Sequence, residues 1–245
     1  MLSFIVFCFS GLTFGWASLV ILLRRDGVYE SECKEEEGST DEGYLCDAQA
    51  VQFSLTYTLA QFCHVFFGLP VGFLLDALPA LLGTRTRGVV TTASLGLLMI
   101  GAGFLLLADF SSSSSSSTTT KSSDTLVLPA MMLLGCGGPT VFFPVLRCAE
   151  AFKAWGENHF ISLMNALFDA SAVVFALLLV AYRAMGSSSS DRRTLFAAGG
   201  FAAITAIAAL VFVASSLDFE GEAVEQEQEQ EQEQEQGRDS SSGGS

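Results

Sequence analysis

NALFDASAVVFALLLVAY, residues 165–182, is the stretch that decides the class of fold. It belongs to an apolar segment, 160–182, that is long enough to cross a bilayer, which takes roughly 20 residues in a helix. The run does not alternate as a barrel strand would, and backbone groups in lipid have no water to bond, so the segment must be helical. Asp169 stands inside it. Since a charge in hydrocarbon costs at least about 2.5 kcal/mol, this acid is a candidate functional residue.

The composition of the whole chain also indicates a membrane protein. Half of its 245 residues are hydrophobic and 16% are charged, whereas a soluble domain carries about a quarter charged residues. The formal net charge of −14 does not mark a binding site, because 19 of the 26 acidic residues lie in 26–47 and 218–239. No basic pattern indicates nucleic-acid binding.

Five further apolar segments have a similar length, and each is bounded by charges or by Ser/Gly-rich sequence. We therefore predict an all-α membrane protein, a six-transmembrane-helix bundle, with helices near Leu2–Leu23, Ala50–Leu75, Gly88–Ala108, Thr125–Leu146, Phe160–Tyr182 and Leu195–Ala214. A cleaved signal peptide is the alternative for the first segment. That segment lacks a positively charged start, however, and it is long for a signal sequence.

The polar segments are of low complexity. Ser111–Thr120 and Ser187–Ser190 are Ser/Thr runs, and Glu225–Gln236 alternates Glu with Gln. The alternating stretch has no apolar face to bury, so it is expected to be disordered or a lone solvated helix. We predict a membrane domain over 1–217 and a disordered acidic tail over 218–245.

Two cysteines, Cys33 and Cys46, share the polar loop 24–49. A disulfide between them would contribute about 3 kcal/mol and would require an oxidising compartment, which places the loop outside the cytoplasm. Two free thiols are the alternative, and the distribution of Lys and Arg weakly favours the opposite orientation. The remaining cysteines lie in or at the ends of helices and are predicted to be packing residues: Cys8, Cys63, Cys136 and Cys148.

The loop after the second predicted helix has the sequence GFLLDALPALLGTRTRG, residues 72–88. It resembles the signature loop between helices two and three of the major facilitator superfamily. The matching elements are Gly72, Asp76, Gly83, Arg85 and Arg87. The resemblance implies a gating loop in which Asp76 and the arginines form a charge-assisted clasp. The alternative is simple interfacial charge.

Longer stretches narrow the resemblance to the branch of system-L-type neutral amino acid facilitators. They are FGWASLVILLRRDGVYESEC (14–33), LPVGFLLD (69–76), GCGGPTVFFPVLRCAEAF (135–152) and ISLMNALFDASAVVF (161–175). The resemblance implies a twelve-helix transporter of two six-helix halves, of which this chain matches the first. It also implies that the Cys33/Cys46 loop lies outside and that Arg85 and Arg87 lie inside.

Polar residues within the predicted helices are candidates for lining a solute cavity. Asn165 and Asp169 are four residues apart and share a helix face. Tyr57, Gln61, His64 and Gly68 also follow one helix face. We expect both faces to be turned towards the bundle interior. Interhelical hydrogen bonding is the alternative for both, and proton coupling is a further hypothesis for Asp169 and His64.

Glycines indicate places where helices approach closely. Gly11 and Gly15 form a small-residue pair on the first helix. The fourth helix contains GCGGP, and this motif predicts either a bend or tight packing at Gly135, Gly137, Gly138 and Pro139.

No hydrolase elbow, phosphate loop or metal-binding spacing of Cys and His is present, so we predict neither an enzyme nor a metal or cofactor site. The predicted function is alternating-access transport of a small solute across a plasma or organellar membrane. The solute is expected to be a neutral amino acid or a similar metabolite, from the resemblance alone. A second six-helix half, in the same chain or another copy, is the expected partner. A non-transporting assembly or regulatory protein is the alternative.

Overall fold

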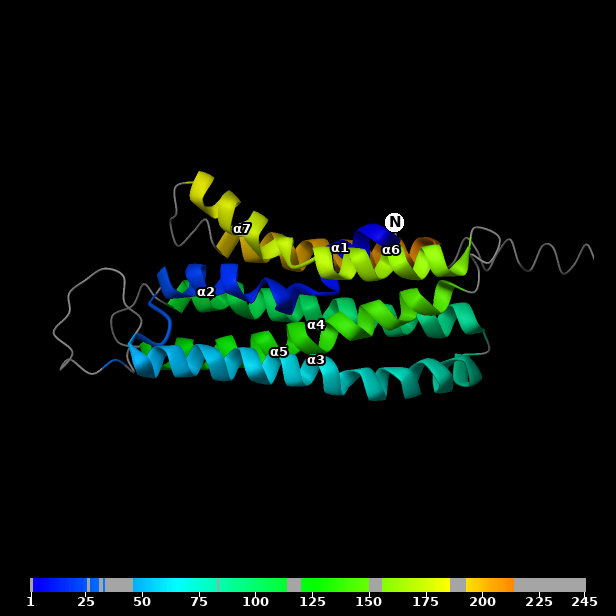
Figure 1. Cartoon of the computed structure of the whole chain (residues 1–245), viewed down its shortest axis with the longest axis horizontal. Helices are drawn as coiled ribbons and strands as arrows, with labels where there is room; N and C mark the ends of the chain where they lie inside the picture. The colour runs from blue at the N-terminus through cyan, green and yellow to red at the C-terminus, as the bar shows by residue number, and fades with distance from the viewer. Residues whose placement is uncertain are drawn as a thin grey trace, which may run out of the picture.

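The computed structural model describes residues 2–25, 27–30, 33, 46–82, 84–113, 120–149, 156–185 and 193–213. Over these residues the chain forms helices and turns, with no strand. Figure 1 shows the helices running side by side along the long axis of the molecule. Gly83, the loop 34–45, the Ser/Thr run at 114–119 and the tail from 214 onward lie outside the described residues.

The labelled elements follow one another along the chain. They are α1 (Leu2–Phe9), η1 (Leu12–Gly15), α2 (Trp16–Arg25), α3 (Asp47–Leu82), α4 (Arg85–Ser113), α5 (Thr120–Arg147), α6 (Glu157–Ala170) and α7 (Val173–Ala184). A final helix, Arg193–Val213, is drawn in orange in Figure 1. α6 and α7 together form one span, Glu157–Ala184.

Five of these helices are long and apolar enough to cross a membrane. The pair α1 with η1–α2 passes the same test when the two parts are taken together, with a bend of 43° between them, and it gives six spans if it is counted as one, which we call the first span. The prediction of an all-α membrane bundle is therefore confirmed. The first span differs from the unbroken helix that we predicted, because it is interrupted at Ser10–Gly11. Glycine weakens a helix there, and the Ser10 hydroxyl bonds back to the carbonyl of Val6.

α5 is the central helix of the bundle. In its most apolar window, 67% of the residues are buried within the bundle, compared with 17–44% for the other unbent spans. It packs against α3, α4 and the first span. It stays one continuous helix although Pro129, Pro139 and Pro144 lie inside it.

The glycines of α5 explain its central position. A side chain at Gly135 would collide with the carbonyl of Ala60 in α3, and one at Gly137 would lie 2.9 Å from the carbonyl of Gly96 in α4. A side chain at Gly138 would collide with the carbonyl of Ser10. The three glycines therefore allow three different helices to approach the same stretch of α5, which supports the packing interpretation of this motif.

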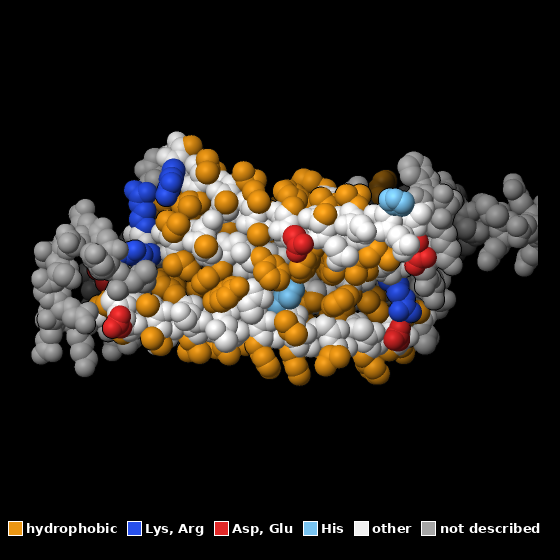
Figure 2. Space-filling view, in the orientation of Figure 1, with side chains coloured by type: hydrophobic (Ala, Val, Ile, Leu, Met, Phe, Trp, Pro, Cys, Tyr) orange, Lys and Arg blue, Asp and Glu red, His pale blue; other side chains and the backbone are white. Residues whose placement is uncertain are grey.

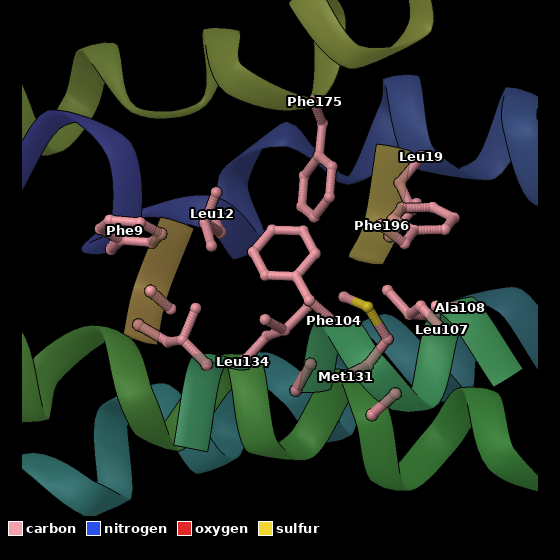
Figure 3. Close-up of a cluster of buried hydrophobic side chains, with 14 of the residues drawn as sticks. Phe9, Leu12, Leu19, Phe104, Leu107, Ala108, Met131, Leu134, Phe175 and Phe196 are labelled. Atoms are coloured by element: carbon pink, nitrogen blue, oxygen red, sulfur yellow. The ribbon is translucent and has the colours of Figure 1, made fainter. Parts of the chain in front are cut away.

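The hydrophobic core lies between α4, α5 and the opposing spans. Figure 3 shows Phe104 of α4 pointing towards Phe175 of α7, with Phe196 of the last helix to one side, near Leu19. The ring centroids lie 6.1 Å and 6.4 Å from that of Phe104. These aromatic contacts join α7 and the last helix to α4.

Candidate functional site

The surface between the two ends of the bundle is a broad hydrophobic band. Figure 2 shows charged side chains gathered towards the ends, with one acidic and one histidine side chain near mid-length on the face in view. Asp169 and His64 are the described acidic and histidine residues nearest the middle of their spans, Glu157–Ala184 and Asp47–Pro79. Two ionisable side chains near the middle of their spans distinguish this face from an ordinary lipid-facing surface.

Asp169 does not point into the six-helix bundle, contrary to our expectation. Its side chain is exposed on the surface of α6, as is that of Asn165 one turn earlier. The amide of Asn165 donates to the carbonyl of Ile161 at 3.0 Å, within its own helix. These polar groups therefore lie on a face of α6 that the other described helices leave uncovered.

The stripe on α3 meets the first span. The Tyr57 ring stacks on Trp16 with 5.9 Å between centroids, and Gln61 Nε2 donates to the Tyr57 hydroxyl at 3.2 Å. Further along the same helix, the His64 ring lies edge-on to Phe14, with centroids 5.6 Å apart. This part of α3 is therefore half-buried against the first span rather than fully inside the bundle.

Phe168 connects the α3 stripe to Asp169. Its ring lies 5.6 Å from that of His64 and 5.5 Å from that of Phe14, measured between centroids. Phe14, His64 and Phe168 therefore bring three spans together at the level of Asp169, the next residue along α6. Sequence reasoning missed Phe14 and Phe168, since aromatic residues are frequent in every span and nothing in the pattern marks these two.

Two interrupted spans touch at this level. A side chain at Gly11, where the first span breaks, would collide with the Ser171 hydroxyl and the carbonyl of Phe168. Ser171 lies in the turn that separates α6 from α7, and its hydroxyl donates to the carbonyl of Phe168 at 2.6 Å. Gly15 similarly approaches the carbonyl of Ala172. The predicted glycine pair thus brings the two breaks into contact, next to Asp169.

Two polar atoms near this contact lack hydrogen-bond partners among the described residues. They are the Thr13 hydroxyl in η1 and Nδ1 of His64, both buried. Thr13 is 1% exposed, so its hydroxyl is held away from lipid and bulk solvent. Buried polar atoms without partners are uncommon in proteins.

Among the gating-loop residues, Asp76 forms an ion pair with Arg147 at the end of α5, with 3.0 Å between Oδ1 and Nη2. Sequence reasoning missed this partner and named only Arg85 and Arg87, which are nearer in sequence. The clasp with those two arginines stays a prediction. Gly83 and the side chain of Arg85 lie outside the described residues, while Gly72 lies in α3, where an added Cβ atom would have no neighbour within 4 Å. The parallel course of α3 and α5 brings the ends of these two helices together, and sequence proximity does not reveal that.

The opposite end of the bundle is stabilised by the start of the polar loop. Cys33 and Cys46 form a disulfide with 5.9 Å between their Cα atoms. Val28 and Tyr29 are buried, and the Gln49 amide donates to the carbonyl of Val28 at 2.6 Å. This end is therefore an ordered cap.

The same cap also joins the first span to α7. The guanidinium of Arg25 lies 5.8 Å from the centre of the Tyr182 ring, and Tyr182 is itself buried. The first span, α3 and α7 thus meet at this end of the bundle.

The described residues contain no group of three or more His, Cys, Asp or Glu arranged to hold a metal ion. What they do form is an all-helical, multi-pass integral membrane protein with Asn165 and Asp169 exposed on an uncovered face of α6. The chemistry available on that face is hydrogen bonding and ion pairing at mid-span, beside an aromatic cluster.

Sequence comparison finds relatives that are named as transporters. The chain is 28% identical over 177 residues to equilibrative nucleobase transporter 1 of Bos taurus, covering 71% of this chain and 32% of that protein. It is 28% identical over 182 residues to large neutral amino acids transporter small subunit 3 of Mus musculus, covering 72% and 29%. It is 29% identical over 150 residues to arginine transporter 1 of Toxoplasma gondii, covering 58% and 24%.

The chain thus spans about a third or less of the length of these relatives. No protein-family model matches it. No solved structure matches it. The names of the three relatives describe transport and not an enzymatic reaction, which agrees with the prediction of a non-enzyme.

Proposed function

We propose that this chain forms one six-helix half of a transporter that moves a small solute by alternating access. The observation that carries the proposal is the acid at mid-span, Asp169, exposed on a face that the other described helices leave uncovered. An ionised side chain on a lipid-facing surface is costly, whereas one that faces water and a solute between two halves is stabilised. The three named relatives support transport as the general activity.

The expected partner is a second six-helix half, as the resemblance to the major facilitator superfamily implies. It would cover the face that carries Asp169 and Asn165 and so remove their side chains from lipid. The break in the first span supports a solute site at the same level, because interrupted helices near mid-membrane are a recurring feature of solute sites in transporters.

The proposed solute is a neutral amino acid or a similar small polar metabolite. The Asp169 carboxylate would accept hydrogen bonds from an ammonium group, and the Gln61 amide and Tyr57 hydroxyl are further polar groups, on α3. The rings of Phe14 and Phe168 would supply an apolar surface for the solute side chain. Two of the relatives are named for amino acid transport.

Uptake by proteoliposomes tests the proposal. The purified chain is reconstituted, and the entry of labelled leucine, adenine and arginine is followed separately. Leucine uptake above that of protein-free vesicles, reduced by excess unlabelled leucine, is the expected result. Adenine or arginine uptake without leucine uptake would retain transport but contradict the solute. The oligomeric state of the reconstituted protein is measured by cross-linking. No uptake of any of the three by protein that is shown to be paired would contradict transport by this chain and favour the assembly or regulatory alternative.

A further inference from the structure

Two cysteines flank the close contact between α3 and α5. Cys63 belongs to α3 and is partly exposed, whereas Cys136 belongs to α5 and is buried. Cys136 directly follows Gly135, and Cys63 directly precedes His64, and both of those neighbours lie at the α3–α5 contact. The proposed transport function uses neither cysteine, so their placement calls for a separate explanation.

The backbones of α3 and α5 approach closely on both sides of this pair. A side chain at Gly135 would collide with the carbonyl of Ala60, and one at Gly138 would lie 3.1 Å from the His64 ring. Further along α3, a side chain at Gly68 would lie 3.2 Å from the Phe143 ring. The two helices therefore run parallel in a continuous tight register, and Cys63 and Cys136 lie within it. A disulfide requires Cα atoms within about 7 Å, and neighbours on both sides of the two cysteines, Ala60 with Gly135 and His64 with Gly138, are in contact.

The other free cysteines have no such arrangement. Cys148 Sγ lies 3.5 Å from the carbonyl of Pro144, four residues earlier in the chain, and burial raises the pKa of its thiol. Cys8 lies in α1 and is partly buried. These two cysteines are matched controls within the same chain.

We propose that Cys63 and Cys136 form a dithiol modification site that a peroxide converts to a disulfide between α3 and α5. The partly exposed Cys63 sulfur attacks one peroxide oxygen, the O–O bond breaks, and a sulfenic acid and one water are formed. The Cys136 sulfur then attacks the Cys63 sulfur and displaces the oxygen as a second water. The two sulfurs lose two electrons in total, hydrogen peroxide gains them, and both thiol protons leave in the two waters.

The new bond would tie α3 to α5 one residue away from His64. It would therefore fix the position of the His64 ring relative to Gly138 and the first span. The proposal concerns bond formation and does not depend on which solute the bundle carries, or on whether it carries one.

Fragment linkage tests the proposal in the full chain. A protease site is placed in the Ser/Thr run at 114–119, which separates Cys63 from Cys136 and leaves Cys33 and Cys46 in the same fragment. Membranes are treated with hydrogen peroxide, remaining thiols are blocked with N-ethylmaleimide, and the protein is cleaved and run on a denaturing gel without reductant. We expect the two fragments to migrate together after peroxide and to separate after dithiothreitol.

Single substitutions identify the bond. C63S and C136S should each abolish the linked band, whereas C8S and C148S should keep it. Retention of the Cys33–Cys46 disulfide, measured by peptide mass, shows that each variant has folded. Separate fragments in the peroxide-treated wild type, or a linked band that persists in a folded C63S or C136S, would overturn the proposal.

Discussion

Single glycines decide how closely the helices of this bundle approach one another. Gly138 faces a backbone carbonyl of the first span and the His64 ring at the same time, while Gly72 in α3 faces open space. In lipid there is little hydrophobic force between helices, so such backbone contacts carry much of the association. The same residue type therefore has different roles at these two positions.

Substituting Gly138 with Ala should destabilise the bundle. Overpacking of a tight site costs about 1–3 kcal/mol, which exceeds the gain of up to about 1 kcal/mol from removing glycine from a helix. The measurement is the midpoint of thermal unfolding in detergent. Gly72→Ala is the matched control and should leave the midpoint unchanged or slightly raised, and equal effects of the two substitutions would contradict the packing role of Gly138.

Asp169 supports a second prediction at the residue scale. If its carboxylate bonds a solute ammonium group, Asp169→Asn removes a charge-assisted interaction of about 1.5–3 kcal/mol, and leucine uptake should fall by roughly tenfold or more. Asp109→Asn is the control, since Asp109 is also exposed but lies at the end of its span. Unchanged uptake in Asp169→Asn would leave Asp169 with a packing role.

At the scale of elements, the ends and the breaks of the helices determine which spans are joined. The break after Ser10 lies against the turn at Ser171, so the first span and the α6–α7 span contact each other where both are interrupted. At one end of the bundle, Asp76 of α3 and Arg147 of α5 form an ion pair between parallel helices. Their side chains are 67% and 38% exposed, so the pair is screened by water and its contribution is modest.

A double-mutant cycle on Asp76→Asn and Arg147→Gln should give a coupling free energy of about 0.2–1 kcal/mol, as expected for a partly exposed ion pair. The unfolding free energy of the four proteins in the cycle is the measurement. Exchanging the two residues, as D76R with R147D, should restore most of the loss. Zero coupling together with no recovery in the exchange variant would show that Asp76 has another partner.

At the scale of the whole molecule, six spans give the bundle two chemically different ends. The disulfide between Cys33 and Cys46 lies at the end where α3 begins, and the Asp76–Arg147 pair lies near the end where α3 finishes. Since a structural disulfide forms in an oxidising compartment, the first end is expected to face away from the cytoplasm. The excess of arginines on that side opposes this orientation, so an experiment has to decide between them.

Labelling the two ends of one span tests the orientation. Glu157 and Arg183 lie near opposite ends of Glu157–Ala184 and both are exposed. An impermeant maleimide added to the non-cytoplasmic side of the membrane should label Arg183→Cys. The same reagent added to the cytoplasmic side should label Glu157→Cys. The parent protein measures background labelling of the native thiols, and the reverse pattern would mean that the positive-inside count was the better guide.

The sequence by itself determined the class of the protein and the approximate limits of its long apolar helices. Each of these follows from a local cause, because every long apolar segment must satisfy its own backbone hydrogen bonds in lipid. The proximity of Cys33 to Cys46 could also be predicted, since they share one short loop. The glycines of α5 could be recognised as candidates for close contacts, but not their three separate partners.

Only the tertiary structure decided which faces meet. It paired Asp76 with Arg147, set the break at Gly11 against Ser171, and placed Asp169 on the outer face of the bundle. Such pairings depend on the rotation and register of helices that are far apart in the chain. Those quantities are fixed by packing between helices, which no single segment encodes on its own.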